Sequence, residues 1–320
     1  MLKPVFKIQI GPETFEPAAT SEIISVHVCL DMDTPADSFE IEFGVSNKSS
    51  KIKEEDDASI QLGYEGHLVD VFKGAVDSVE PGISGIRVTG LNFMSKLLEL
   101  RVNQVYENQT AGGLVSDLTN KASVRTEEIS DGINFPMYVV DDSKNAYDHI
   151  RDLAEKCGFD VYMSSENTLV FNKYERTEPH VLEYGKDIIQ ADLNEEKPLV
   201  AGVVVQGESP SSFKGADTSH WLTKRQVEGV AGSGARLLIQ DPTVRDKDTA
   251  EKVATAWLDA LTRTLSGIVK AIGKAEVKLG DTIELKGMRN SKMNGEFQVR
   301  SVEHFLSKTE GFTTLIGWRK

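Results

Sequence analysis

The sequence has few of the residues that cross-link small domains or bind metals in them. Its 320 residues include two cysteines, Cys29 and Cys157, which lie far apart among apolar neighbours. No CxxC pair and no zinc-like spacing is present, which excludes a disulfide framework or a zinc module as the basis of the fold. We expect two buried free thiols and synthesis in a reducing cytoplasm.

Long apolar runs are also missing. The N-terminal segment MLKPVFKIQI has neither the apolar core nor the small-residue cleavage site of a signal peptide. No run approaches the roughly 20 residues needed to cross a bilayer. We therefore expect neither a leader nor a membrane anchor.

Motifs of catalysis and ligand binding are scarce. Segment 232–239, GSGARLLI, lacks the third glycine of a dinucleotide loop, and AGG at 111–113 is not followed by Lys-Ser or Lys-Thr. GxSxG is absent, SSFK at 211–214 lacks partner motifs, and the acidic run at 54–57 is typical of a solvated loop. We expect no enzyme, no catalytic residue and no cofactor, and hence no hydrolase activity.

Histidines and tryptophans are scattered. None of the histidines forms HxxxH or HExxH, so we expect no metal site; they are His27, His67, His149, His180, His220 and His304. We expect His27 on the solvent side of a strand, and His304 either on a β surface or in one hydrogen bond. Three tryptophans, Trp221, Trp257 and Trp318, are too few to suggest a sugar platform. Trp257 is expected in the core, and Trp318 at the end of the last strand.

Acidic residues are in excess, but unevenly. The chain has 36 basic and 50 acidic side chains, a net charge of −14. Residues 1–95 carry 7 basic and 16 acidic side chains, so 7 − 16 = −9 falls on this part. Because binding to phosphates needs lysine and arginine, we expect no specific nucleic-acid binding.

The N-terminal part, 1–95, has the pattern of short β-strands. In DSFEIEFGV, Phe39, Ile41, Phe43 and Val45 alternate with Glu40 and Glu42, which predicts a half-buried strand. Gly63 to Gly66 and Pro81-Gly82 predict turns between further strands. A small barrel or sandwich is expected here.

The middle part, 96–175, changes to α+β. Thr110 is expected to cap a short helix, and Ser143 a longer one. The second helix has a single apolar stripe and stops at Gly158; the stripe is Ala146, Tyr147, Ile150, Leu153, Ala154 and Cys157. FDVYM and TLVFN then predict a hairpin.

The C-terminal part returns to β. Residues 207–235 are rich in glycine and polar residues and predict a mobile loop. A helix is expected at about 248–265, followed by strands to the end. Its apolar stripe is Ala250, Val253, Ala254, Trp257, Leu258, Leu261 and Leu265.

Several segments, in order, resemble the phage late-control D / VgrG-type baseplate hub family of contractile tails and related injection systems. They are the F-x-G and G-x-N strand ends, VYENQTAGGLVSDL, NAYDHIRDLAEKCGFDVYM, AGVVVQGESP, and LGDTIELKG through GEFQVRSVEHFLSKTEGFTTLIG. The first two motifs place Phe72, Gly74, Gly90 and Asn92 at family positions. Unlike VgrG proteins, this chain has no spike segment before Lys320.

The resemblance implies a mainly β fold with an α+β insertion and two tail-tube-like β-barrels per chain. The first barrel would use 1–95, completed by about 176–206, and 96–175 would be the inserted α+β domain. The second would use 207–320, with the helix at 248–265 packed against it. The sequence pattern by itself supports only the β, α+β, β order.

The function implied by the resemblance is a structural hub. A homotrimer would form a pseudo-sixfold ring that joins the tail tube to a separate central spike, with tape-measure and other baseplate proteins as neighbours. It would be made in the bacterial cytoplasm and assembled into the tail. A lytic tail enzyme and a receptor-binding tail protein are the alternatives. They would require, respectively, an isolated acid pair or nucleophile in a cleft, and exposed aromatics in loops.

Overall fold

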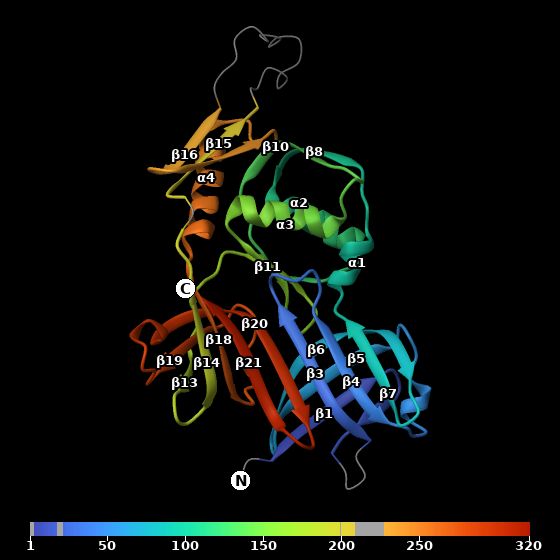
Figure 1. Cartoon of the computed structure of the whole chain (residues 1–320). Coiled ribbons are helices and arrows are strands. Elements are labelled where there is room, and N and C mark those ends of the chain that lie inside the picture. Colours follow the sequence, from blue (N-terminus) through green and yellow to red (C-terminus); the bar gives the residue numbers. More distant parts are fainter. Residues whose placement is uncertain (1–2, 18–21, 199, 209–226) are drawn as a thin grey trace.

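The computed structural model of the chain describes residues 3–17, 22–198, 200–208 and 227–320. A β body, drawn at the bottom of Figure 1, contains the strands from both ends of the chain, and an α+β part lies above it. The C-terminal end lies where the two meet. The buried apolar side chains of the described residues form two clusters, one in the β body and one in the α+β part.

One sheet, called the main sheet here, builds the β body and unites both ends of the chain. Thirteen of the described strands belong to it. Along its path they are β14 (Ile188–Glu195), β18 (Leu265–Ile272), β21 (Gly311–Arg319), β20 (Gly295–Ser307), β3 (Ile23–Asp31), β4 (Ser38–Gly44), β7 (Gly85–Leu91), β6 (His67–Pro81), β5 (Asp57–Tyr64), β1 (Pro4–Ile10) and β2 (Glu13–Phe15), with β19 (Thr282–Lys286) beside β20 and β13 (His180–Glu183) beside β19.

The predicted alternation in β4 is confirmed. Phe39, Ile41 and Phe43 are buried in the body's core, and Glu40 lies half-exposed on the opposite face. Val45 was expected on the buried face but is 61% exposed, because the strand ends at Gly44 and the chain turns away from the sheet. The period of two therefore holds only within the hydrogen-bonded strand.

The joint between N-terminal and C-terminal strands is the antiparallel pair β20 and β3. Strands β13 and β14 pair with β19 and β18, so residues 180–195 extend the C-terminal strands. This corrects the expectation that about 176–206 would complete the N-terminal barrel, since apolar alternation does not specify which strand becomes the partner. The path from β14 to β2 closes no barrel among the described strands, and the two-barrel arrangement stays a prediction.

The α+β part contains four helices and three small sheets among the described residues. Its helices are α1 (Met94–Glu99), α2 (Ala111–Lys121), α3 (Ala146–Cys157) and α4 (Lys247–Thr262). Its strands are β8 (Gln104–Thr110), β9 (Thr126–Ile129), β10 (Asn134–Val140), β11 (Asp160–Met163), β12 (Leu169–Asn172), β15 (Gly202–Gly207), β16 (Glu228–Gly232) and β17 (Arg236–Asp241). β8 pairs with β10, β12 lies between β11 and β9, and β15 lies between β16 and β17. Two short 3-10 turns, Ser49–Lys51 and Ser291–Met293, lie in loops elsewhere in the chain.

Local signals fix the starts and ends of helices. The Thr110 hydroxyl accepts a hydrogen bond from the Gly113 amide at 3.0 Å, which confirms it as the cap of α2. The expectation that Ser143 caps α3 is wrong: the Asn145 side chain accepts from the Asp148 amide at 2.8 Å. Gly158 ends α3 at φ +68°, in the left-handed region that glycine adopts without strain.

Helix α4 differs from its expected bounds and packing. It ends at Thr262, so Leu265 lies in β18 and not on the helical stripe. Ala250, Val253 and Ala254 are buried against β15, β16 and α3. The helix thus covers the α+β part, whereas the family resemblance implied packing against a second β-barrel at 207–320. A helical stripe indicates that one face is buried but not what it is buried against.

The expected loop at 207–235 is shorter than its composition suggests. Strand β16 occupies Glu228–Gly232 and pairs with β15. The GSGARLLI segment is the turn from β16 into β17, so it joins two strands and opens no helix. Residues 209–226, with SSFK, His220 and Trp221, lie outside the described residues.

Candidate interaction surfaces

Three residues at positions that match the family motifs lie in the core of the main sheet: Phe72, Gly74 and Gly90. Phe72 on β6 contacts Phe39 on β4 edge to face, with ring centroids 5.4 Å apart. A Cβ at Gly90 would lie 2.2 Å from the Phe39 ring and 2.3 Å from the carbonyl oxygen of Ala75, and one at Gly74 would lie 2.2 Å from a backbone oxygen. These positions allow two aromatic rings to lie directly on the backbone, so their role is structural.

Asn92, the fourth family-like residue, lies in a buried polar joint between the main sheet and α1. Its amide donates to the Asp37 carboxylate at 2.6 Å, and its own oxygen accepts from the Met94 amide at 3.2 Å. The Asp31 amide also donates to Asp37 at 2.8 Å. Burial raises the pKa of Asp37 to about 7 despite these hydrogen bonds. The G-x-N pattern identified Asn92, but no local pattern marked Asp37 as its partner.

The five histidines within the described residues do not converge on a site. His304 is 1% exposed and its Nδ1 lies 3.0 Å from the Thr314 hydroxyl, so the expected single hydrogen bond is right and the surface position is wrong. Burial lowers its pKa to about 3, which keeps it neutral. His27 lies on the solvent side as expected, 3.3 Å from Glu303. His180 contacts Asp281 at 3.0 Å, and this carboxylate raises its pKa.

Both cysteines are half-buried, less than the full burial expected. Burial raises the pKa of each thiol to about 11. At Cys157 the Ile133 amide donates to Sγ at 3.4 Å. Thiols that stay protonated are poor nucleophiles, so these two are structural.

The described residues show no cluster of metal ligands. They contain no group of three or more side chains placed to hold a metal. Of the helices that the structure describes, none is both long and apolar enough to span a bilayer. Trp257 is half-buried on α4, while Trp318 is 2% exposed and stacks on Phe297 at 4.1 Å.

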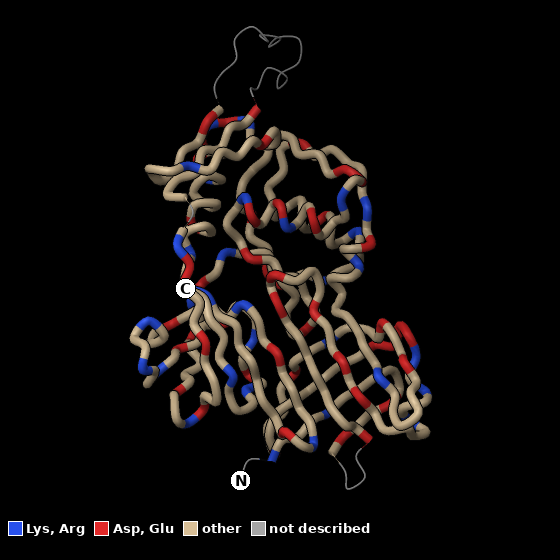
Figure 2. The backbone as a smooth tube through the Cα atoms, viewed as in Figure 1, with Lys and Arg blue, Asp and Glu red and all other residues tan. Residues whose placement is uncertain are grey.

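Acidic and basic residues lie along the strands of the main sheet (Figure 2). The face opposite its core, called the outer face here, carries charges of both signs. Glu40 and Glu42 on β4 lie 3.6 and 3.5 Å from the Arg87 guanidinium on β7. On β20 and β3, Glu303 faces His27 at 3.3 Å. The acidic surplus of residues 1–95 is therefore partly compensated on this face.

The edge at β14 exposes both backbone and apolar side chains. Among the described strands β14 pairs only with β18, apart from an isolated bridge of Ile188 to Tyr184. Ile189 is 56% exposed, and Ile268 and Ile272 on the adjoining β18 are 46% and 37% exposed. An unpaired strand edge with apolar side chains invites pairing with another chain.

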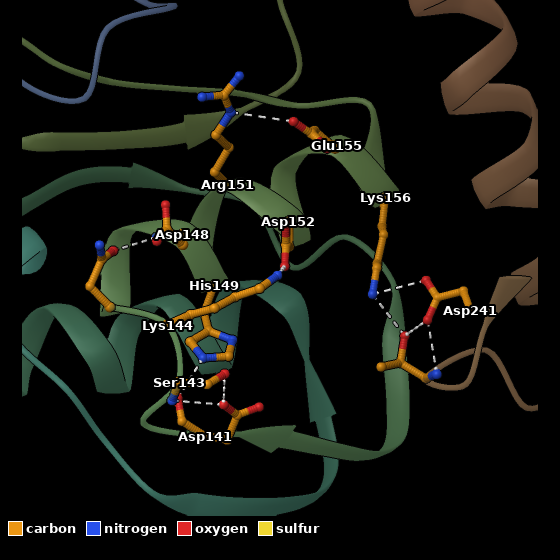
Figure 3. Close-up of polar contacts among 12 residues, drawn as sticks. Asp141, Ser143, Lys144, Asp148, His149, Arg151, Asp152, Glu155, Lys156 and Asp241 are labelled. Carbon is orange, nitrogen blue, oxygen red and sulfur yellow. Dashed lines mark hydrogen bonds and ion pairs between the residues drawn. The ribbon is translucent and has the colours of Figure 1, made fainter. Parts of the chain in front are cut away.

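Ion pairs hold the α+β part together around α3 (Figure 3). Lys156 at the end of α3 reaches Asp241 at the end of β17, with 2.9 Å between Nζ and Oδ2. Burial opposes ionisation of Asp241, but Lys156 and the Thr243 hydroxyl outweigh it and hold its pKa below the usual range. His149 contacts the Asp141 carbonyl oxygen at 3.0 Å, and Lys144 reaches back to Asp152. These contacts fix the elements rather than form a reactive centre.

Comparison with known proteins supplies a family and a fold. A family model described as the Alg8 N-terminal domain matches residues 25–308. No curated protein sequence matches the chain.

Solved structures with this fold include phage tail proteins and a component of a type VI secretion system. The 43 kDa tail protein of prophage MuSo2 from Shewanella oneidensis superposes with a TM-score of 0.75 at 12% identity, covering 99% of this chain and 98% of that one. A tail protein from Neisseria meningitidis MC58 gives 0.74 at 12% identity, covering 99% and 96%. The Escherichia coli c3393 protein, a component of the type VI secretion system, gives 0.64 at 11% identity, covering 98% and 76%. The chain therefore has the fold of phage tail proteins, and this confirms the predicted resemblance to tail proteins at the level of the fold.

Proposed function

We propose that the chain, which belongs to the family of the Alg8 N-terminal domain, is a structural baseplate hub, because it has the fold of phage tail proteins. In this proposal, three copies form a pseudo-sixfold ring in a contractile phage tail or a related injection system. One side of the ring seats the tail tube and the other the central spike. The hub has no catalytic activity or cofactor, and it is assembled from cytoplasmic protein.

The observation that carries the proposal is the continuity of the main sheet. Strands from both ends of the chain join at β20 and β3, and the sheet then ends at β14 with an unpaired edge. Two β units side by side in each of three chains would present six similar units to a sixfold tube. Pairing of β14 with a neighbouring chain would satisfy its backbone and cover Ile189.

The outer face is the surface that we assign to the channel wall. Its carboxylates Glu40 and Glu42 are matched by one arginine, Arg87, so the wall would be neutral to acidic. Such a wall repels phosphates or leaves them unbound, which suits a conduit. A ring whose lumen is lined mainly by lysine and arginine would contradict this assignment.

A charge placed on the β14 edge tests the proposal. We expect Ile189→Lys to prevent assembly, because a lysine there would have to be desolvated between strands. Ile83→Lys is the matched control, since Ile83 is fully exposed in a turn away from this edge. Sedimentation velocity should find trimers for the wild type and for the control, and monomers for Ile189→Lys. Trimers of Ile189→Lys as stable as those of the wild type would contradict the use of this edge.

A further inference from the structure

A cavity of about 660 Å³ lies where the α+β part meets the β body. Helix α4 and the end of α3 form its upper wall, and the ends of β20 and β21 form its floor, beside the C-terminal end in Figure 1. Trp257, Ala260 and Met32 line part of it with apolar surface. This volume is within the range of pockets that enclose small ligands or a few side chains.

Four arginines line this cavity: Arg151 on α3, Arg263 after α4, Arg300 on β20 and Arg319 on β21. The charge of Arg300 is matched, because its guanidinium contacts Asp33 at 2.9 Å and also pairs with Asp160, although its Nε is buried without a hydrogen-bond partner in the described structure. Among the residues that the structure describes, neither Arg263 nor Arg319 has an ion-pair partner. The cavity thus holds two guanidinium groups whose charge no carboxylate of the described chain directly matches.

Most carboxylates around the cavity already have basic partners. Glu155 pairs with Arg151 at 3.3 Å, and Asp248 with Lys252 at 2.6 Å. They are therefore not available to Arg263 and Arg319.

Of these arginines, Arg319 has the charge that its surroundings most disfavour. Its Nε is buried without a hydrogen-bond partner in the described structure. Burial, together with the like charges of Arg300 and Arg263, lowers the pKa of Arg319 to about 10. A carboxylate bound between Arg319 and Arg263 would offset the repulsion between these like charges.

We propose that this cavity is a carboxylate-binding site in which Arg319 and Arg263 hold an acidic side chain from a polypeptide segment of a partner protein. A planar carboxylate matches the fork of a guanidinium and can accept two hydrogen bonds from it. The apolar wall with Trp257 suits the aliphatic stem of a glutamate.

The surrounding charges favour a carboxylate over a phosphate. Asp33 and Asp160 lie behind Arg300, and Asp259 lies on the rim. A phosphate that carries nearly two negative charges would be repelled by these groups more strongly than a singly charged carboxylate. Inorganic phosphate or a phosphate monoester is therefore the less favoured occupant.

That the occupant is a neighbouring protein of the assembly rests on the proposed function. Carboxylate binding itself does not, and it can be measured on the isolated chain whether or not it forms trimers. Failure of the assembly test would leave carboxylate binding intact, and failure of the binding test would leave the proposed trimer intact.

The experiment titrates the full chain with acetylated hexaglutamate, followed by thermal unfolding and by tryptophan fluorescence, to which Trp257 on the cavity wall contributes. At about ten times its Kd the peptide is expected to raise Tm by about 2 °C. Arg319→Met should weaken binding at least tenfold, and Arg263→Gln should weaken it less. The control Arg289→Gln, an exposed arginine in a distant loop, should bind as the wild type does.

The free variants provide a second readout. Arg319→Met keeps the length of the side chain but removes a poorly placed charge, so its Tm without peptide should equal or exceed that of the wild type. A lower Tm would assign Arg319 a structural role and overturn the proposal. Equal binding by Arg319→Met and wild type would overturn it as well, and so would tighter binding of inorganic phosphate than of the peptide.

Discussion

Replacing Gly90 with alanine tests how two aromatic rings come to lie on the backbone of the main sheet. Gly90 is in β7 without a positive φ, so alanine brings no backbone strain of its own. Its Cβ, however, would lie 2.2 Å from the Phe39 ring and 2.3 Å from the Ala75 carbonyl oxygen. The ring is 1% exposed and packs edge to face against Phe72, so it is enclosed in the core.

The size of the destabilisation follows from the side chains that must move to make room for the new methyl group. Displacing Phe39 from its edge-to-face contact with Phe72 forfeits about 0.5–1.5 kcal/mol. Forcing an extra methyl into a close-packed core costs about 1–3 kcal/mol more. We expect Gly90→Ala to lower the free energy of unfolding by about 2–4 kcal/mol.

Urea unfolding followed by circular dichroism measures this difference. Gly44→Ala is the matched control: Gly44 is also in the sheet without a positive φ, and its Cβ would meet only a backbone oxygen at an ordinary 3.6 Å. The control should change stability by less than about 1 kcal/mol. In a Phe39→Leu background the penalty of Gly90→Ala should shrink, because the smaller side chain leaves room. Equal stabilities of Gly90→Ala and Gly44→Ala would refute the reasoning.

Three further predictions concern the buried polar joint and the helices. Burial raises the pKa of Asp37 to about 7, so the native state holds this proton more tightly than the unfolded chain does. The resulting stabilisation is present below about pH 4 and is lost as pH rises through 7. Asp37→Asn should make the urea midpoint depend less on pH across that window, and an unchanged pH profile would contradict the raised pKa. Leu261→Asp should cost about 2 kcal/mol because Leu261 packs against the core of the α+β part, whereas the exposed neighbour Thr262→Asp should cost little in thermal unfolding. Asn145→Ala should lower stability by about 1 kcal/mol in urea unfolding by removing the cap of α3, and a larger loss from Ser143→Ala would reverse that assignment.

Within elements, the sequence predicted burial well. The alternation at Phe39, Ile41 and Phe43 and the stripe at Ile150 and Leu153 are both confirmed, because each depends only on the local repeat of strand or helix. The start of α2 was found from Thr110, since a cap bonds within its own first turn.

Partners across the fold could not be predicted in the same way. The pairing of β14 with β18 and of β20 with β3 joins segments whose alternation fits many partners. Helix α4 covers the α+β part because β15 and β16 offer it an apolar face, which its own stripe does not encode. The arginine cavity was missed for the same reason: Arg263, Arg300 and Arg319 form no motif, and only the fold brings them together.

The proposed role as a trimeric hub is tested most directly by the mass of the unaltered chain in solution, measured by native mass spectrometry alone and with its spike protein. The account predicts a species of three times 35.2 kDa, alone at high concentration or once the spike is present. A strict monomer under both conditions would contradict it.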